Sequence, residues 1–192
     1  MARISTEERQ NHIIDEAINI IHEQGFQSLS IREISDKVGI SEPAIYRHFL
    51  NKEDIILGIL SRFSQFDEKL IASLGDSDTP IERIGRFVNF HFSFLEKNPE
   101  FTSVLFSEDI FSQSPILREK IMMIIGKRRR ILTEILNSGN AKLHDSDYDV
   151  KELATLILGY IRLTVLEWRL SNFSFSLTTR GKQAIHMIEK MI

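Results

Sequence analysis

Apolar residues recur along the first part of this chain at intervals of three and four residues, the spacing that gathers them on one face of an α-helix. These positions are Ile13, Ile14, Ala17, Ile20 and Ile21. Ser5 and Glu8 precede them at the spacing of a capping box, in which each side chain bonds the backbone N–H of the other residue. Gly25 follows them and can adopt the left-handed conformation that ends a helix. The pattern therefore predicts a helix over residues 6–24.

Two short helices joined by a glycine-containing turn are predicted within residues 30–52. The motif Ser30-Ile31-Arg32-Glu33 has the capping-box spacing and opens the first of them. Gly39 permits the tight turn, and Ser41 is placed to cap the second helix. Pro43 lies in the first turn of that helix, where a missing N–H does no harm. This arrangement is typical of a helix-turn-helix that reads DNA.

The later helices are predicted from residues that favour a helix start. Asn51 is placed to cap a long helix that continues to about Ser73 without a flexible linker. Three further starts are a capping residue followed by proline, namely Thr79-Pro80, Asn98-Pro99 and Ser114-Pro115. Asp149 resembles another N-cap. The chain is therefore predicted to be all-α, with about nine helices and no strand. Residues 1–52 would form a three-helix DNA-binding domain, and residues 53–192 a second helical domain.

Composition and charge narrow the classes of function. The net charge of −3 argues against a protein that coats nucleic acid without sequence preference, because such proteins are usually basic. The chain has no cysteine, which excludes disulfides and thiolate metal sites, and its six histidines form no metal-spaced pair. No apolar run reaches membrane-spanning length, and charged residues interrupt the N-terminal region where a signal peptide would be apolar. We expect a cytoplasmic protein with no membrane contact, no cofactor and no metal.

The candidate DNA-binding residues are those left outward when the apolar positions of the helix-turn-helix are assigned to its core. That core is predicted to contain Ile31, Ile34, Val38, Ile40, Ile45 and Phe49. Ala44 would touch a thymine methyl, and Arg47 would take guanine or a phosphate. Phosphate oxygens would suit Tyr46, His48 and Lys52. The full predicted DNA-contacting set is Ser30, Arg32, Ser41, Glu42, Pro43, Ala44, Tyr46, Arg47, His48 and Lys52.

Residues 5–52 resemble the DNA-binding domain of the TetR family of one-component transcriptional regulators. The matching positions are Gly25-Phe26, Ile31, Ile34, Val38-Gly39-Ile40-Ser41, Ala44-Ile45-Tyr46, His48-Phe49 and Asn51-Lys52-Glu53. Many members of the family carry glycine where this chain has Pro43. The resemblance implies an all-helical dimer, in which residues 53–192 would form a helical effector-binding and dimerisation domain with a small-molecule site.

Aromatic residues are concentrated in the region where the resembled family has its effector site. Of the 13 phenylalanines, only Phe26 and Phe49 precede residue 52. The cluster predicts a pocket for a hydrophobic or aromatic ligand, with His91 as a polar anchor, although core packing is the alternative for any single phenylalanine. The predicted ligand-binding set is Phe63, Phe66, Phe87, Phe90, His91, Phe94, Phe106 and Met122.

Four consecutive cations, Lys127 to Arg130, have two interpretations. The first is a solvated helix face. The second is contact between one or two of them and the phosphates of an acyl thioester of coenzyme A, a ligand that some members of the resembled family sense.

The segment from about Val150 to Leu170 is apolar around most of its circumference, and a helix buried on two faces needs two partners. One partner would be its own domain, and the other the same helix of a second subunit. Gly159 would allow close approach, but periodicity leaves open which face turns outward. The predicted interface, within a four-helix bundle, is Leu156, Gly159, Tyr160, Leu163, Ile185 and Ile188.

These features together predict a homodimeric repressor on a palindromic double-stranded DNA operator, with two recognition helices in major grooves roughly 34–36 Å apart. A small hydrophobic or aromatic effector would release the operator. The alternatives are a sensor of an acyl-coenzyme A or fatty acid, a ligand-responsive activator, a ligand-independent DNA-binding protein and a protein-binding adaptor. An enzyme is not expected, because the chain offers no Ser/His/Asp set, no cysteine nucleophile and no glycine-rich phosphate loop.

Overall fold

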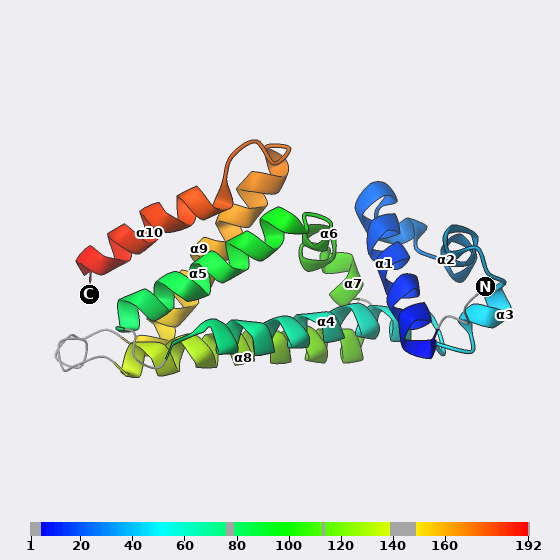
Figure 1. Cartoon of the computed structure of the whole chain (residues 1–192), viewed down its shortest axis with the longest axis horizontal. Helices are drawn as coiled ribbons and strands as arrows, with labels where there is room; N and C mark the ends of the chain where they lie inside the picture. Colours follow the sequence, from blue (N-terminus) through cyan, green and yellow to red (C-terminus); the bar gives the residue numbers. More distant parts are fainter. Residues whose placement is uncertain (1–4, 76–78, 113, 139–148, 192) are drawn as a thin grey trace. The chain divides into compact units, whose positions relative to one another are not determined.

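The computed structural model describes residues 5–75, 79–112, 114–138 and 149–191 (Figure 1). Within these ranges the chain forms ten α-helices, one short 3-10 helix and no strand, so the predicted all-α fold is confirmed. The elements are α1 (Thr6–Gln24), η1 (Phe26–Ser28), α2 (Ile31–Val38), α3 (Glu42–Ile45), α4 (Lys52–Ser73), α5 (Pro80–Lys97), α6 (Phe101–Leu105), α7 (Glu108–Ser112), α8 (Pro115–Asn137), α9 (Val150–Leu170) and α10 (Leu177–Met191). None of these helices combines the length and the apolar character needed to cross a membrane.

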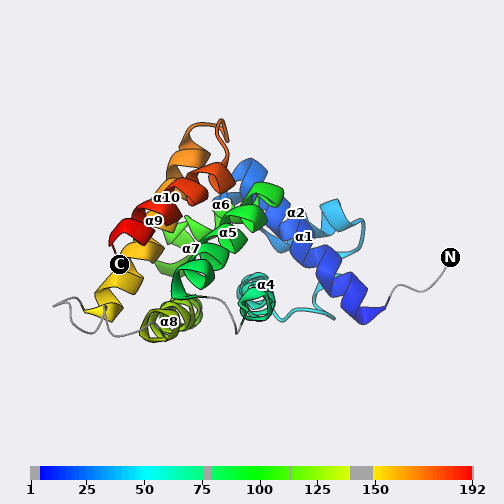
Figure 2. The ribbon, with the colours of Figure 1, turned by 60° about the vertical axis from the view of Figure 1, so that its left-hand side comes forward.

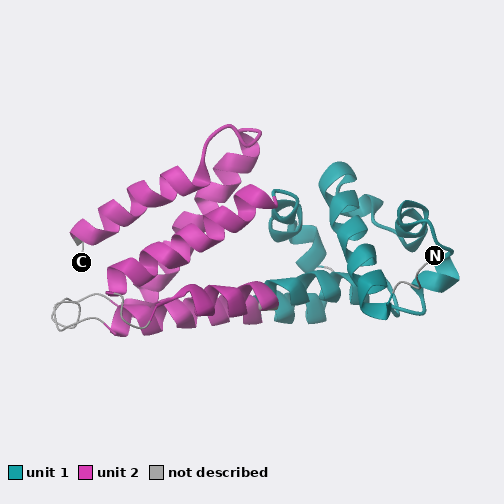
Figure 3. Cartoon of the chain, viewed as in Figure 1, with its two compact units in different colours: residues 1–64, 99–122 teal, residues 65–98, 123–192 magenta. Residues whose placement is uncertain are grey.

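The chain forms two compact units (Figure 3). The first contains residues 1–64 and 99–122, and the second contains residues 65–98 and 123–192. Helices α4 and α8 therefore contribute residues to both units. These two units are defined by packing, whereas the two domains predicted from the sequence, divided after residue 52, are defined by function.

Helix α1 supplies the core of the first unit with one apolar face, and it packs against α2, α6 and η1. Its buried residues are Ile13, Ile14, Ala17, Ile18, Ile20 and Ile21. The predicted capping box is confirmed: Glu8 N–H donates to Ser5 Oγ at 3.1 Å, and Ser5 N–H donates to Glu8 Oε2 at 2.8 Å. The helix ends at Gly25, whose φ of 84° is strained for any residue with a side chain. The predicted bounds of this helix are therefore correct.

The second capping box is only half formed. Ser30 Oγ accepts from Glu33 N–H at 3.1 Å, but the Glu33 carboxylate accepts from Gln24 Nε2 at 3.4 Å, and no reciprocal bond to Ser30 N–H is formed. Gly39 has the predicted left-handed conformation, with φ 72° and ψ 35°. Two predicted core residues, Ile31 and Ile40, are only half-buried, whereas the other four are buried.

Most of the predicted helix starts are confirmed. Side-chain oxygens of Asn51, Thr79, Ser114 and Asp149 accept backbone N–H groups from Asp54 (2.9 Å), Glu82 (3.3 Å), Leu117 (3.3 Å) and Lys151 (2.8 Å). The prediction at Asn98 was wrong, because this residue ends α5 and its Nδ2 donates back to the Phe94 carbonyl at 2.8 Å. The following segment forms two short helices, separated at Phe106 and Ser107, where one was predicted. The described residues therefore form ten helices and not about nine.

The second unit is held together by close packing of α10 along α5, and both helices contact α9 (Figures 1 and 2). A Cβ atom at Gly181 of α10 would lie 2.9 Å from the ring of Phe92 in α5. Leu177, Gly181 and Ala184 lie on one face of α10, and all three are buried within this chain. That face of α10 is therefore an internal contact.

Candidate DNA-binding and effector sites

Helix α3 and the turn after it expose most of the predicted DNA-contacting residues. Ser41, Glu42, Pro43 and Arg47 are exposed, and Tyr46 is 52% exposed. Although α3 ends at Ile45, Tyr46 N–H donates to the Glu42 carbonyl at 3.2 Å and Phe49 N–H to the Ile45 carbonyl at 3.1 Å. The Ser41 side chain makes no capping bond, so its hydroxyl is available to a phosphate oxygen.

The start of α2 adds two exposed residues, Ser30 and Arg32. The Ser30 hydroxyl already accepts from Glu33 N–H, which leaves its own O–H free to donate. Arg32 lies in the first turn of α2, where the positive end of the helix dipole also favours an anion.

Three of the predicted DNA contacts are less exposed than the sequence indicated. Ala44 is half-buried. His48 is half-buried, its Nδ1 has no hydrogen-bond partner, and its backbone carbonyl accepts from Gln10 Nε2 at 3.3 Å. Lys52 holds its Nζ 4.2 Å from the centre of the Phe26 ring, and partial burial lowers its pKa from the usual value. Its ammonium therefore lies over an aromatic ring at the start of α4.

An aromatic cluster lies within the second unit, centred on Phe66 of α4. The Phe66 ring centre lies 4.8 Å from that of Phe90, 5.0 Å from that of His91 and 4.8 Å from that of Phe94. The ring centre of Phe87 lies 4.4 Å from that of His91, and Phe87 is fully buried. Five of the eight predicted ligand-binding residues are therefore brought together here.

A buried ion pair lies beside this cluster, and sequence reasoning missed its acidic member. Asp67 is completely buried, and its Oδ1 accepts from Arg128 Nε at 3.1 Å. Lys127 Nζ lies 3.9 Å from the other carboxylate oxygen, and the Arg128 guanidinium lies 5.0 Å from the centre of the Phe66 ring. Burial lowers the pKa of Arg128, and the charge of Asp67 opposes that shift. The signal in the sequence that could have indicated this pair was an acidic residue, Asp67, on the apolar face of α4.

The four cations at residues 127–130 thus have two environments. Arg128 is nearly buried, and the prediction of a wholly solvated face was wrong for it. Arg129 and Arg130 are exposed, as that prediction expected.

His91 is buried in the cluster as a neutral ring. Its Nδ1–H donates to the Phe87 carbonyl at 2.8 Å, which leaves Nε2 as a hydrogen-bond acceptor with no partner. Burial, followed by the nearby charge of Arg128, lowers its pKa to about 3. A buried acceptor without a partner is costly, so a ligand that brings a donor would be favoured here.

The other three predicted ligand-binding residues belong to the first unit. Phe63 is buried and packs edge-on against Phe101, with ring centres 5.4 Å apart. Phe106 follows α6 and is half-buried. Met122 is 59% exposed on α8 and does not line an interior site.

Helix α9 has one buried face and one exposed apolar face. Ala154, Ile157, Ile161, Val165 and Trp168 are among the residues buried within the unit. Leu156 and Leu163 are 68% and 57% exposed, and Gly159 between them has no atom within 4 Å of where a Cβ would be. Of the remaining predicted interface residues, Ile185 and Ile188 are half-buried, and Tyr160 donates its hydroxyl to the Arg180 carbonyl at 3.2 Å.

Two family models together match almost the whole chain. The model described as bacterial regulatory proteins, tetR family, matches residues 13–59. The model described as YsiA-like protein, C-terminal region, matches residues 60–190.

Individual proteins show the same similarity over most of their length. The chain is 28% identical over 182 residues to the fatty acid metabolism regulator protein of Bacillus subtilis (strain 168), covering 92% of this chain and 91% of that protein. The fatty acid degradation regulator FadR from Bacillus halodurans has a TM-score of 0.83 at 25% identity, covering 93% of each chain. The transcriptional regulator FadR from Bacillus subtilis, solved in complex with stearoyl-CoA, has a TM-score of 0.81 at 27% identity, covering 92% of this chain and 96% of that one.

Proposed function

The chain belongs to the TetR family of bacterial regulatory proteins, and from this premise we propose that it is a dimeric repressor whose operator is released by an acyl thioester of coenzyme A. It is a DNA-binding transcriptional regulator and not an enzyme. The effector, the dimer, the palindromic operator and the roles of individual residues belong to the proposal. Its effector part depends chiefly on one observation, the cation pair beside the aromatic cluster of the second unit.

The proposed DNA face consists of α3, the start of α2 and the start of α4. Exposed Tyr46, Arg47 and Ser41 carry donors that suit phosphate oxygens and base edges. Because the whole chain has a net charge of −3, one such face offers few cationic contacts. Two copies on a palindromic operator would supply the affinity that one copy lacks.

The proposed dimer uses the outward apolar face of α9. Leu156, Gly159 and Leu163 recur at intervals of three and four residues, so they form a single stripe. Large apolar side chains are exposed at both ends of this stretch, and the glycine between them permits close approach of another helix. A two-fold axis would place the same stripe of the second copy against it.

The proposed effector site is the aromatic cluster with its charged edge. Phe66, Phe90 and Phe94 suit an acyl chain, and the unpartnered His91 Nε2 suits a donor such as an amide N–H. Lys127 and Arg128 bring two cations to the buried carboxylate of Asp67, and this charged edge of the cluster suits an anionic group. The similarity to a regulator solved with stearoyl-CoA supports the same ligand class.

A hydrophobic or aromatic ligand without the nucleotide remains the second candidate, because the buried rings alone would favour it. In both cases α4 is suited to transmit binding, since it begins at Lys52 in the proposed DNA face and carries Phe66 and Asp67 into the cluster. The ligand would act by favouring a state that binds the operator less well.

The proposal is tested with a duplex that the wild-type protein selects from a random-sequence pool. In gel shifts, stearoyl-CoA is expected to release this duplex, whereas coenzyme A alone is not. Stearate is the discriminating ligand: release by stearate at equal concentration would favour the second candidate. Failure of every acyl ligand to bind or to release the duplex would contradict the effector assignment.

The DNA face is tested in the same assay with Tyr46→Ala and Lys52→Ala combined. This double variant is expected to bind the duplex at least about tenfold more weakly, because it loses phosphate contacts in both subunits. Its mass in solution and its affinity for stearoyl-CoA should not change. Unchanged affinity for the duplex would remove these residues from the DNA face.

A further inference from the structure

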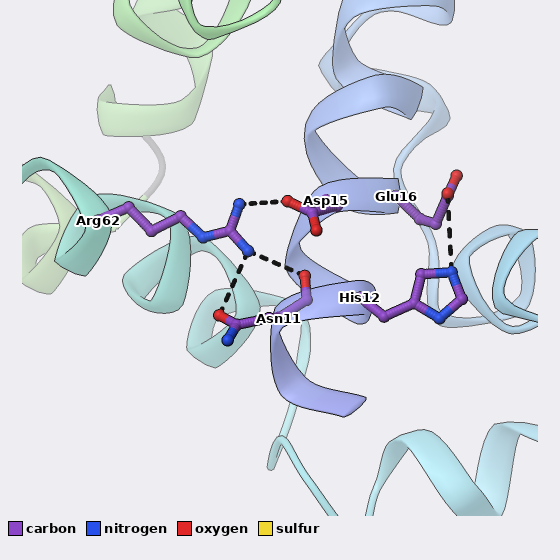
Figure 4. A network of polar contacts seen from close by, with 5 residues as sticks. All are labelled: Asn11, His12, Asp15, Glu16 and Arg62. Carbon is purple, nitrogen blue, oxygen red and sulfur yellow. Dashed lines mark hydrogen bonds and ion pairs between the residues drawn. The ribbon is translucent and has the colours of Figure 1, made fainter. Parts of the chain in front are cut away.

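Arg62 of α4 joins α4 to α1 through several hydrogen bonds within the first unit (Figure 4). Its Nη1 donates to Asp15 Oδ1, and the two groups also form an ion pair. Its Nη2 donates to the backbone carbonyl of Asn11 at 2.9 Å and to Asn11 Oδ1 at 3.4 Å. One planar guanidinium therefore binds two residues that lie one turn apart on α1, which fixes direction as well as distance.

The same two helices make a close apolar contact one turn earlier on α4. A Cβ atom at Gly58 would lie 2.9 Å from Ile14 Cδ1 and 3.3 Å from Phe49 Cε1. Gly58 and Arg62 are four residues apart and therefore share one face of α4. Ile14 lies between Asn11 and Asp15 in the sequence of α1. The crossing thus has an apolar part, which sets how closely the helices approach, and a polar part formed by Arg62.

Helix α1 in turn holds the elements of the proposed DNA face. It packs against α2, and Gln10 Nε2 donates to the His48 carbonyl in the turn after α3 at 3.3 Å. Gln10 and Asn11 are adjacent in α1. The contact of α1 with the turn after α3 and its contact with Arg62 therefore lie at the same level of the helix. A rotation of α4 about its contact with α1 would have to break the Arg62 bonds.

We propose that Arg62 is a positioning residue for operator binding: its bonds to Asn11 and Asp15 hold α1, and with it α2 and α3, in the orientation on α4 that fits DNA. This inference rests on the DNA face proposed above. The Arg62 side chain is 21% exposed and that of Asp15 is 56% exposed, so their ion pair contributes little to folding. Such a contact can break and re-form without loss of the core, which suits a regulator that must alternate between two states.

The test compares Arg62→Gln and Arg62→Lys with the wild-type full chain on the selected duplex. Arg62→Gln removes the charge and the fork, and is expected to weaken binding about tenfold, the size of one charge-assisted contact. Arg62→Lys keeps the charge but cannot reach both partners with a planar fork, so its affinity should be intermediate. The slope of log K against log salt should equal that of the wild type, because Arg62 is proposed to make no phosphate contact.

Two further comparisons separate positioning from stability and from simple charge loss. Ser5→Ala removes the cap of the same helix α1, and Lys69→Gln removes one exposed positive charge from α4. Both should bind the duplex as the wild type does. If Ser5→Ala weakens binding as much as Arg62→Gln does, the effect comes from the stability of α1 and the inference is wrong. A reduced salt slope for Arg62→Gln would also overturn it, since Arg62 would then bind DNA directly.

A double-mutant cycle gives the decisive measurement. If Asp15 acts through Arg62, Asp15→Ala combined with Arg62→Ala should weaken binding no more than Arg62→Ala alone. Additive losses would contradict the proposed link. The Tyr46→Ala and Lys52→Ala variant reports separately on the DNA face. Loss of binding in that variant with normal binding in all Arg62 variants would reject the positioning role alone.

Discussion

His91 illustrates how its surroundings decide the chemistry of a single side chain. The sequence offered it as a polar anchor among phenylalanines, and in the structure its ring contacts the rings of Phe66 and Phe87. Burial and the charge of Arg128 keep the ring neutral, and the bond to the Phe87 carbonyl fixes which nitrogen carries the proton. His91 Nε2 is therefore a neutral hydrogen-bond acceptor, and the ring is not a cation.

A pH dependence of stability follows from this histidine. Its pKa is about 3 in the folded chain and 6.5 when unperturbed, so between these values the unfolded chain binds one more proton. The free energy of unfolding should therefore fall as the pH is lowered, by about 2 kcal/mol from pH 7 to pH 5. Denaturant titrations of the wild type and His91→Phe measure this. The variant should lack that part of the decrease, and equal slopes in the two proteins would contradict the assignment.

At the scale of helices, small residues decide which surfaces meet. The contact between α5 and α10 depends on Gly181, where a Cβ would lie 2.9 Å from the fully buried Phe92 ring. Gly126 of α8 has no atom within 4 Å of its Cβ position. Two glycines that look alike in the sequence thus differ in the structure. Gly181 permits close packing of α10 on α5, whereas a Cβ atom at Gly126 would meet no neighbouring atom.

Alanine substitutions at these two glycines should therefore have different effects on stability. Both gain helix propensity of up to about 1 kcal/mol, but only Gly181→Ala must displace a packed ring, at a cost of about 1–3 kcal/mol. Thermal unfolding is expected to show a lower melting temperature for Gly181→Ala and an equal or higher one for Gly126→Ala. A Gly181→Ala protein as stable as Gly126→Ala would show that α10 does not need this close contact.

For the whole molecule, the main question is how one chain with a negative net charge binds DNA. The proposed answer is a dimer formed through the exposed stripe on α9, which contains Leu156, Gly159 and Leu163. Exposed apolar residues in a regular stripe mark an interaction site more reliably than single exposed ones do.

Charged side chains in this stripe should separate the subunits without unfolding them. Leu156→Arg with Leu163→Arg is expected to halve the mass in solution and to weaken binding of the selected duplex, because the two DNA faces are no longer joined. Ile116→Arg, an exposed apolar position on α8, is the matched control and should remain dimeric. Sedimentation equilibrium measures the mass. A dimer that persists in the double variant would place the interface elsewhere.

The sequence by itself determined most of the elements and the helix-turn-helix motif, because the interactions that define them are local. Ser5 and Glu8 cap α1 across three residues, Gly39 needs only its own backbone freedom, and Asn51 caps the helix that begins beside it. The helix-turn-helix pattern combines such local signals, which is why its resemblance to a known family is visible in the amino-acid sequence alone.

Tertiary structure decided what depends on partners far away in the chain. Asp67 and Arg128 are separated by 61 residues, and no local pattern distinguishes Arg128 from its exposed neighbour Arg129. Periodicity showed that α9 has two apolar faces, but only packing against α5 and α10 determined that Leu156 and Leu163 turn outward. Helical spacing sorts residues onto faces, whereas burial assigns each face a partner, and that assignment requires the folded chain.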